Sequence, residues 1–563
     1  MESECQYMQA YLPFSFPETF LSPAKGVFEV LHYSFFTKYI RFYLSANVQK
    51  KRKLFINFQF SSLNSQFFSK FVAENCKKIM TDNHSEKIPS PLLALVPVIV
   101  LVVLLFFAIR IFGSNALDGA SQIVLLIATA VSILIAMTCC HIKWDTIESA
   151  IVRNIAGVTT ALIILLLIGA LSGSWMISGI VPILIYYGVK IIHPDYFLVT
   201  TCLICSFVSV MTGSSWTTVA TIGIALFGIG RVQGFHEGWI AGAIISGAYF
   251  GDKVSPLSDT TILASSITET PLYKHIQYLM ITTVPSMTIT LLIFTIAGFS
   301  HRGATMEDIS VFTSALSRSF HISAWLMLVP LLMFVLIIRK LPPIITLFFA
   351  VVGAGVCAII FQPELLHLVA GAEEHSASSV FEWLIITLSA STQLETGNTM
   401  LNELVSTRGM GGMMNTIWLI ICAMCFGGAM TAANMLTSIM SIFLRFVKRT
   451  AGLVASTVCT AIFLNICTAD QYLAIILTGN MYKDTYRERG YESRLLSRTT
   501  EDSATVTSVL VPWNTCGMTQ AAVLGVPVFV FFPYCFFNLI SPLMSILVAL
   551  TGFKIKKIQN EKN

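Results

Sequence analysis

Charged residues are scarce in this chain. Only 12% of its 563 residues are Asp, Glu, Lys or Arg, and 55% are hydrophobic, whereas soluble domains carry about 25% charged residues. Beyond residue 90 no polar stretch is longer than a loop, which excludes a separate soluble domain there. Together with long apolar runs such as Pro91–Phe112, this balance is typical of a membrane protein that crosses the bilayer many times.

Recognisable catalytic motifs are also lacking. The sequence has no HExxH zinc motif, GxSxG nucleophile elbow, Walker loop or dinucleotide fingerprint in its proper context. We therefore expect neither an enzyme nor a cofactor. The 13 Cys residues are scattered, and the CxxC pairs Cys202–Cys205 and Cys422–Cys425 are interpreted as small buried hydrophobic residues, because no further thiol or His pattern accompanies them.

The stretch before Met80 lacks Asp and differs in composition from the rest of the chain. It contains 13 of the 40 Phe residues, 10 Lys or Arg against five acids, and no apolar region of signal-peptide shape. This composition resembles translated A/T-rich non-coding DNA. We expect residues 1–79 to be a non-native N-terminal extension, the native start to be Met80, and residues 80–560 to form a single transmembrane domain. A basic arm on the membrane surface is the alternative.

Four apolar segments are interrupted by Gly, Ser, Thr, Asn, Asp or Pro. A membrane tolerates such interruptions only where the backbone lines a site or a cavity. The remaining runs predict plain helices, Pro527–Leu550 among them, and the total suggests roughly ten to twelve spans at about 20 residues each. The interrupted segments are Leu203–Gly230, Trp239–Ser266, Val454–Leu477 and Ser503–Gly525.

The interrupted segments form two matching pairs. Thr212 leads Thr-Gly-Ser and Thr468 leads Thr-Ala-Asp, while Pro256 leads Pro-Leu-Ser-Asp-Thr and Pro512 leads Pro-Trp-Asn-Thr. The step from Thr212 to Thr468 is identical in length to the step from Pro256 to Pro512. This shared spacing predicts an internal repeat, with the first copy at about residues 150–300 and the second at about 410–550. Corresponding interrupted segments in two repeats point to the binding site of a transporter.

Asp252 and Asp259 are the first candidate ion ligands. Pro256 lies between them, so a continuous helix is not expected. Carboxylates and freed carbonyls are hard oxygen ligands that suit Na+, and a carboxylate binds Na+ or H+ in competition. We expect Asp252 to be the stronger ligand because Gly251 allows close approach of the backbone. The alternative is structural: Asp252 pairs with Lys253, and Asp259 caps the next half-helix.

The second half offers further candidates. Asp470 is a lone acid in apolar surroundings, which is costly inside a membrane; a hairpin tip exposed to water is the alternative. Asp502 is a candidate ligand, while its neighbour Glu501 is interpreted as an ordinary helix cap. Hydroxyls and amides supply neutral oxygen ligands, although they also bond to their own helices. The neutral candidates are Thr212, Ser214, Ser215, Ser258, Thr468, Asn514 and Thr515.

Basic residues indicate part of the topology. The richest cluster runs from Lys483 to Arg498 and is interpreted as a loop. The positive-inside rule places such a loop in the cytoplasm.

Several of these segments resemble the signature segments of the NhaC-type Na+/H+ antiporter family. They are TGSSWTTVATIG, GAYFGDKVSPLSDTT, TADQYLAII, SRTTEDSATVTS and PWNTCG, and the resemblance covers about residues 90–550. It implies a multi-pass antiporter of the bacterial inner membrane that exchanges Na+ for H+. It also implies an all-α polytopic fold of two inverted repeats, each with a re-entrant hairpin and a broken transmembrane helix.

On this resemblance the hairpin tips fall at Thr212–Thr218 and Thr468–Gln471, and the breaks at Gly251–Thr260 and Val511–Thr515. The expected partners are Na+, H+ and the lipid bilayer, with a homodimer as a candidate assembly and no nucleic acid. Relatives that exchange malate for lactate make an organic-anion antiporter the alternative. An anion would need a cation at mid-membrane, and only Lys253 qualifies. A passive channel is disfavoured because a repeat with asymmetric acids suits a carrier.

Overall fold

The computed structural model describes residues 89–112, 119–300, 306–339, 341–365, 377–394, 396–444 and 449–557. Within these ranges the regular structure is helical, with only two isolated β-bridges, which confirms the predicted all-α class. The expected N-terminal extension and the expected start at Met80 lie outside the described residues.

Nine helices among the described residues are long and apolar enough to cross a membrane, or up to eleven if each of two bent helix pairs counts as one span. The upper count falls within the predicted range. The nine are α4 (Pro91–Phe112), α5 (Ala120–Thr138), α7 (Thr159–Ile177), Pro194–Thr212 with α9 (Phe197–Thr212), Ser215–Val232 with α10 (Ser215–Thr218) and α11 (Ile224–Val232), α14 (Leu272–Ser300), α17 (Pro343–Phe361), Gly411–Ala432 with α21 (Met414–Ala432), and α23 (Thr450–Thr468).

Shorter helices complete the described chain. They are α6 (Trp144–Gly157), α8 (Ile180–Ile191), α12 (Glu237–Val254), α13 (Asp259–Ile267), α15 (Met306–Ser319), α16 (Leu328–Ile338), α19 (Ala377–Ser389), α20 (Thr399–Val405), α22 (Met435–Leu444), α24 (Gln471–Glu488), α25 (Ser493–Thr500), the π-helix η8 (Glu501–Thr505), α26 (Thr515–Leu524), α27 (Val528–Phe531) and α28 (Phe536–Thr551).

The prediction of one plain span over Pro527–Leu550 is wrong. α27 ends at Phe531 and α28 begins at Phe536. Pro533 lies between them in a short 3-10 turn, where its ring and missing N–H prevent a continuous α-helix. The first part of the segment bends away from α26 by 88°.

Each of the four interrupted segments contains a break in its helix, as predicted. Gly213 follows the end of α9 and Ala469 follows the end of α23, both with left-handed backbone (φ 68 and φ 55). The next residues, Ser214 and Asp470, accept backbone hydrogen bonds that cap the following helices. Both pairs have the spacing found between Thr212 and Thr468, so the two chain reversals share one local geometry at the predicted repeat length.

The two remaining breaks correspond in the same way. α12 and α13 are separated by a turn that ends at Ser258, which accepts from the backbone N–H of Thr261. In the second half the turn ends at Asn514, which accepts from the N–H of Cys516 and caps α26. Ser258 and Asn514 are separated by the same repeat length as the chain reversals.

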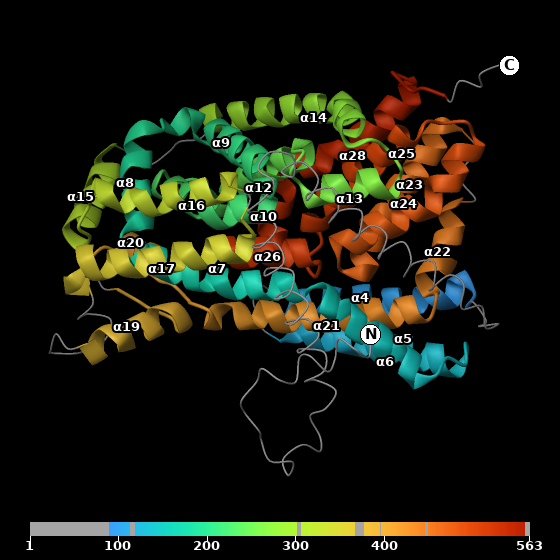
Figure 1. Cartoon of the computed structure of the whole chain (residues 1–563), viewed down its shortest axis with the longest axis horizontal. Helices are drawn as coiled ribbons and strands as arrows, with labels where there is room; N and C mark the ends of the chain where they lie inside the picture. The colour runs from blue at the N-terminus through green and yellow to red at the C-terminus, as the bar shows by residue number, and fades with distance from the viewer. Residues whose placement is uncertain are drawn as a thin grey trace, which may run out of the picture. The chain divides into compact units, whose positions relative to one another are not determined.

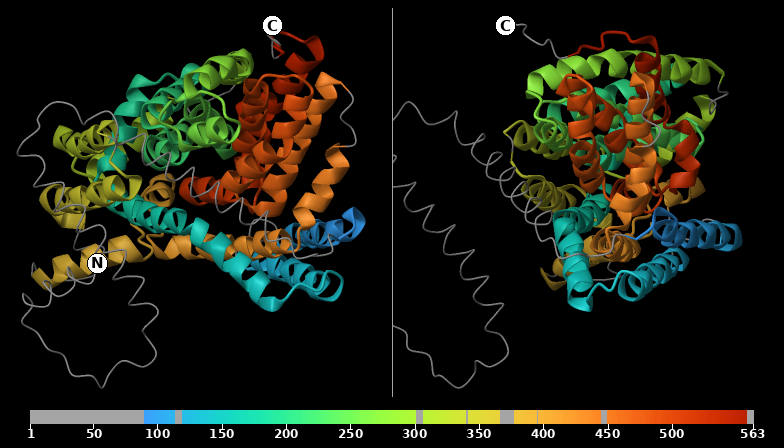
Figure 2. Two further views of the ribbon diagram at one scale, coloured as in Figure 1. Left: turned by 45° about the vertical axis from the view of Figure 1, so that its right-hand side comes forward. Right: turned by 90° about the vertical axis from the view of Figure 1, so that its right-hand side faces the viewer.

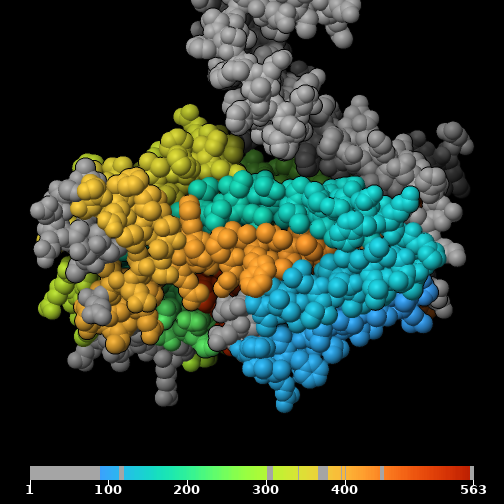
Figure 3. Space-filling view, turned by 90° about the horizontal axis from the view of Figure 1, so that it is seen from below, coloured from blue at the N-terminus to red at the C-terminus, as the bar shows by residue number. Residues whose placement is uncertain are grey.

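Helices α5, α6, α7 and α21 form one layer of the described fold. α21 packs against α5 and α6, and α4 packs against α5 (Figure 1). The right-hand view of Figure 2 shows the cyan helices of this layer, with the blue helix α4 beside them, below the green and red helices that carry breaks. From below, the orange surface of α21 lies between the blue surface of α4 and α5 and the cyan surface of α6 and α7 (Figure 3). We call α5, α6, α7 and α21 the lower layer.

The outward side of α4 is apolar. Leu92 is 79% exposed and Phe106 is 58% exposed. Water would penalise such a surface, whereas lipid would not. The exposed apolar side of α4 is therefore suited to contact with lipid, as expected for the multi-pass membrane protein predicted from composition.

Candidate ion-binding site

Two glycines set the position of the last turn of α12. A Cβ at Gly247 would lie 2.2 Å from the carbonyl oxygen of Cys202, and a Cβ at Gly251 would lie 2.5 Å from that of Ser206. Only Gly permits this close approach of α12 to α9. The Ser209 hydroxyl also donates to the carbonyl oxygen of Ala248 at 2.6 Å. The end of α12 is thereby held inside the helix bundle, where the chain breaks.

Asp252 lies at this end of α12 and meets the N-terminus of α10. Its Oδ2 accepts from the backbone N–H of Ser215 at 3.2 Å and from the Ser215 hydroxyl at 2.7 Å. The side chain is 4% exposed, and its Oδ1 has no hydrogen-bond partner among the described residues. A helix N-terminus stabilises a carboxylate. The fold thus joins two of the predicted ligands and leaves one carboxylate oxygen open.

Lys253 pairs with Asp502 rather than with Asp252. The two side chains are fully buried and form an ion pair between α12 and η8. The hydroxyl of Thr282 donates to the same Asp502 oxygen at 3.0 Å. Arg498 Nε lies 3.8 Å from the other oxygen. Each oxygen of Asp502 therefore faces a cation of the protein itself.

The interpretation of the basic cluster as a loop that extends to Arg498 is wrong. Its side chain is fully buried, and its guanidinium lies 4.7 Å from the ring centroid of Tyr278. α25 begins at Ser493, so Arg498 belongs to a helix inside the fold. A count of charges along the sequence could not separate it from its exposed neighbours.

Glu501 is the functional candidate that sequence reasoning missed. α25 runs into η8 without a break, so Glu501 lies within a helix and is not an N-terminal cap. It is fully buried; Oε1 accepts from the Thr260 hydroxyl at 3.3 Å, and Oε2 has no hydrogen-bond partner among the described residues. The signal was available, because residues 491–511 contain neither Gly nor Pro and therefore favour continuous helix.

Asp259 lies at the edge of this arrangement. It is exposed at the start of α13. Its carboxylate accepts from the Tyr472 hydroxyl at 2.7 Å and from the backbone N–H of Thr260 at 2.9 Å. The helix cap itself is Ser258. Asp259 thus bonds to α24 and to its own helix, whereas Asp252 bonds to α10, so the two acids around Pro256 have different surroundings.

Asp470 lies with the other second-half candidates. It is 5% exposed, and its Oδ1 accepts from the backbone N–H of Leu473 at 2.8 Å. The Thr468 hydroxyl donates to the Asp470 carbonyl oxygen at 3.0 Å. The backbone N–H of Thr515 donates to the carbonyl oxygen of Ala469 at 2.9 Å. The reversal after α23 therefore touches the break before α26.

The neutral candidates mostly bond to backbone near their own breaks. The Thr212 hydroxyl donates to the carbonyl oxygen of Ser214 at 3.3 Å, and the Ser214 hydroxyl accepts from Thr217. The Asn514 amide donates to the carbonyl oxygen of Asn465 at 3.1 Å. These contacts shape the breaks and leave Ser215 as the neutral candidate that contacts a buried carboxylate.

A crevice of about 550 Å³ separates the lower layer from α11 and α26. Its wall includes Pro512, at the second-half break, and Arg231. Arg231 lies 2.9 Å from Glu403 and 3.6 Å from Glu237. The crevice thus leads from an ion-paired rim toward one of the breaks.

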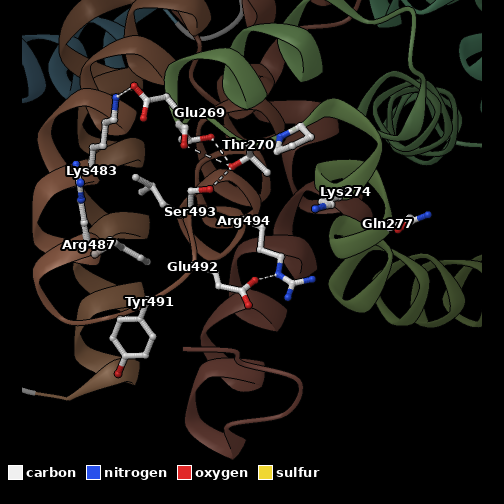
Figure 4. A pocket seen from close by; sticks show the side chains of 14 residues that line it. Glu269, Thr270, Lys274, Gln277, Lys483, Arg487, Tyr491, Glu492, Ser493 and Arg494 are labelled. Carbon is white, nitrogen blue, oxygen red and sulfur yellow. Dashed lines mark hydrogen bonds and ion pairs between the residues drawn. The ribbon is translucent and has the colours of Figure 1, made fainter. Parts of the chain in front are cut away.

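A second cavity, of about 700 Å³, lies between the turn before α14 and the α24–α25 connection (Figure 4). Lys274 and Arg487 line it, together with Lys483, which pairs with Glu269 at 2.6 Å. Lys483 and Arg487 come from the basic cluster found in the sequence, and the cavity wall contains none of the buried carboxylates described above.

Comparison with known proteins identifies the family. The model of the Na+/H+ antiporter family matches residues 247–553, which include three of the four breaks as well as Asp252 and Glu501. This chain belongs to that family. The antiporter is 36% identical to the Na(+)/H(+) antiporter NhaC of Alkalihalophilus pseudofirmus, over 75% of this chain and 88% of the relative. The resemblance to the NhaC-type family is therefore confirmed.

Two Bacillus subtilis proteins are also similar to the antiporter. Its Na(+)/H(+) antiporter NhaC is 35% identical over 72% of this chain and 87% of the relative. Its Malate-2H(+)/Na(+)-lactate antiporter is 33% identical over 81% of this chain and 94% of the relative.

Proposed function

We propose that this antiporter exchanges Na+ for H+ across the bacterial inner membrane, and that both ions compete for oxygens at Asp252. The observation that carries the proposal is the carboxylate itself: it is buried, it lies at the N-terminus of α10, and it forms no ion pair with a described residue. Its open oxygen is a hard ligand of the kind that binds hard cations. Because one oxygen accepts either ion, binding of Na+ displaces the proton.

Alternating access follows from two halves that surround one site. Three pairs of equivalent cap residues, all separated by one repeat length, support an internal repeat. We propose that these are inverted repeats and that the helices carrying the breaks move against the lower layer. The crevice beside Pro512 reaches the second-half break, and we propose that the movement extends it to the site. Such motion around a mid-membrane site is the usual mechanism of repeat-built carriers.

An organic-anion antiporter is the alternative function, because one relative is a Malate-2H(+)/Na(+)-lactate antiporter. A dicarboxylate substrate would need cations within the site. The buried cations Lys253 and Arg498 both lie against Asp502, so a carboxylate of the protein already offsets part of their charge, and Asp252 forms no ion pair with a described residue. This charge arrangement favours Na+ over an organic anion.

The test uses everted membrane vesicles that hold a proton gradient, followed by a pH-sensitive dye. Addition of Na+ should dissipate the gradient, and Li+, K+ and malate are added in turn to define selectivity. Asp252→Asn should abolish the Na+ response, because an amide cannot exchange a proton. Asp145→Asn is the matched control, since Asp145 is exposed on α6. Unchanged Na+ dependence in Asp252→Asn, or a response to malate alone, would contradict the proposal.

A further inference from the structure

We infer that Glu501 and Asp252 together form one Na+ site that is shared between the two halves of the chain. The choice of ion rests on the proposed function. In this site Glu501 is a direct ligand of the ion, whereas the sequence alone suggested a helix cap.

Hydroxyl groups at the start of α13 contact Glu501 and the backbone of Asp252. The Thr260 hydroxyl donates to Glu501 Oε1 at 3.3 Å and lies 2.9 Å from the Ser258 hydroxyl. In the same turn the Thr261 hydroxyl lies 3.4 Å from the carbonyl oxygen of Asp252. Lys253, next to Asp252 in the chain, pairs with Asp502, which is next to Glu501. The side chains of both acids are at most 4% exposed. The two acids therefore belong to one buried polar cluster.

The cluster has oxygen atoms that lack a partner. Asp252 Oδ1 and Glu501 Oε2 are buried without a hydrogen bond to any described residue. Buried polar atoms are seldom left unpaired, because each costs free energy. Buried carboxylate oxygens without a partner are ligands for a hard cation.

The balance of charge indicates one cation. The buried charged side chains of α12, α25 and η8 are three carboxylates, on Asp252, Glu501 and Asp502, and two cations, on Lys253 and Arg498. One negative charge is left uncompensated when every group is ionised, and an unpaired buried charge is costly. A single Na+ bound between Asp252 and Glu501 makes the cluster neutral.

The two ligands come from different halves. Asp252 lies in the last turn of α12 in the first half, whereas Glu501 begins η8 in the second. Bound Na+ therefore ties the two halves together and should stabilise the whole fold. Any species that binds the folded state alone raises the unfolding temperature as its concentration rises.

The experiment follows thermal unfolding of the purified full-length protein in detergent while NaCl replaces choline chloride at constant ionic strength. We expect Na+ to raise the Tm of the natural protein. In Glu501→Gln the Na+ concentration needed for the same rise should be about tenfold higher or more, since even outer groups of a metal site are worth about 10–100-fold in affinity. Glu269→Gln is the matched control, because its side chain is 71% exposed and pairs with Lys483 at the surface.

A second variant keeps the inference testable if Glu501→Gln does not fold. Glu501→Asp keeps the charge but withdraws the carboxylate by one methylene, so its Na+ requirement should rise by less than that of Glu501→Gln. If either folded variant responds to Na+ as the natural protein does, Glu501 is not a ligand and the inference is wrong. Absence of Na+ stabilisation in the natural protein overturns it as well.

The vesicle assay separates this inference from the proposed function. If the natural protein exchanges Na+ for H+ but Glu501→Gln keeps normal stabilisation by Na+, the shared site fails while the proposed function stands. If Na+ stabilises the natural protein through Glu501 but no exchange occurs, the proposed function fails while the shared site stands.

Discussion

Asp502 is the residue on which two buried cations depend. Lys253 and Arg498 both approach its carboxylate, and all three side chains are fully buried. The attraction in such a group compensates for the cost of removing charges from water. Removal of the shared partner is therefore more harmful than removal of one of the two cations.

This asymmetry predicts an order of stability. Asp502→Asn leaves two buried cations without a counter-charge and should lower the free energy of unfolding by about 3–5 kcal/mol. Lys253→Met should lower it by less, because Asp502 keeps Arg498 at 3.8 Å. Thermal or denaturant unfolding in detergent measures both variants. Equal loss in the two would show that Arg498 does not compensate Asp502.

A substitution at Asp470 distinguishes a role in helix capping from a role in ion transport. Asn caps a helix as well as Asp does, so Asp470→Asn should change the free energy of unfolding by less than about 1 kcal/mol. We expect Na+-dependent proton movement to fall strongly, because Asp470 is a buried carboxylate at a break and an amide cannot take up or release a proton. The vesicle assay at matched expression measures the effect. Normal exchange with normal pH dependence would make Asp470 a cap and nothing more.

Among the helices, the contact between α9 and α12 decides where Asp252 lies. Gly247→Ala would drive a methyl group into the Cys202 carbonyl, only 2.2 Å from the new Cβ. We expect a loss of about 1–3 kcal/mol of stability from overpacking. Na+ affinity should also fall, because α12 must move away from the donors of Ser215. Unfolding in detergent, with and without Na+, measures both effects.

Gly157→Ala is the matched control for that change. Apart from the neighbouring backbone of its own helix, no atom of a described residue lies within 4 Å of a Cβ built at Gly157, and the residue ends α6. Its stability and its exchange should stay near those of the natural protein. If both Ala variants behave alike, close packing of α9 on α12 does not position the site.

For the whole molecule, the crevice marks the boundary where movement is expected. Arg231 of α11 and Glu403 of α20 face each other across it at 2.9 Å. Replacing both with Cys and joining them with a short bismaleimide should stop exchange, because α11 could no longer move relative to the chain that leads into α21. The vesicle assay measures exchange before and after treatment, in a background whose other accessible cysteines are replaced.

Single Cys variants treated with the same reagent are the controls, and they should continue to exchange. Full activity in the cross-linked double variant would show that the transport movement does not open this crevice.

The helix breaks could be read from the sequence because their causes are local. Gly213 favours left-handed backbone, and Ser258 and Asn514 are residue types that cap helices. The repeat spacing was visible for the same reason. The span expected over Pro527–Leu550 failed at Pro533, since the apolar composition of the segment concealed a break that proline makes.

The partners of the buried charges could not be predicted from the local sequence. Lys253 is adjacent to Asp252 in the chain, yet its partner is Asp502, 249 residues away. Glu501 was interpreted as a cap because neighbouring acids commonly are, and only the continuous helix from α25 into η8 turns it inward. Such pairings depend on how helices from distant parts of the chain pack together.

The sequence by itself determined the membrane class, the four helix breaks, their spacing and the antiporter family, because composition, turn residues and motifs are properties of short segments. Only the tertiary structure decided which acids are buried, which cations face them and which oxygens remain open. A charge is compensated or left unpaired according to distance in space, and that distance is set by the packing of α9, α12, α14, α25 and η8 around the breaks.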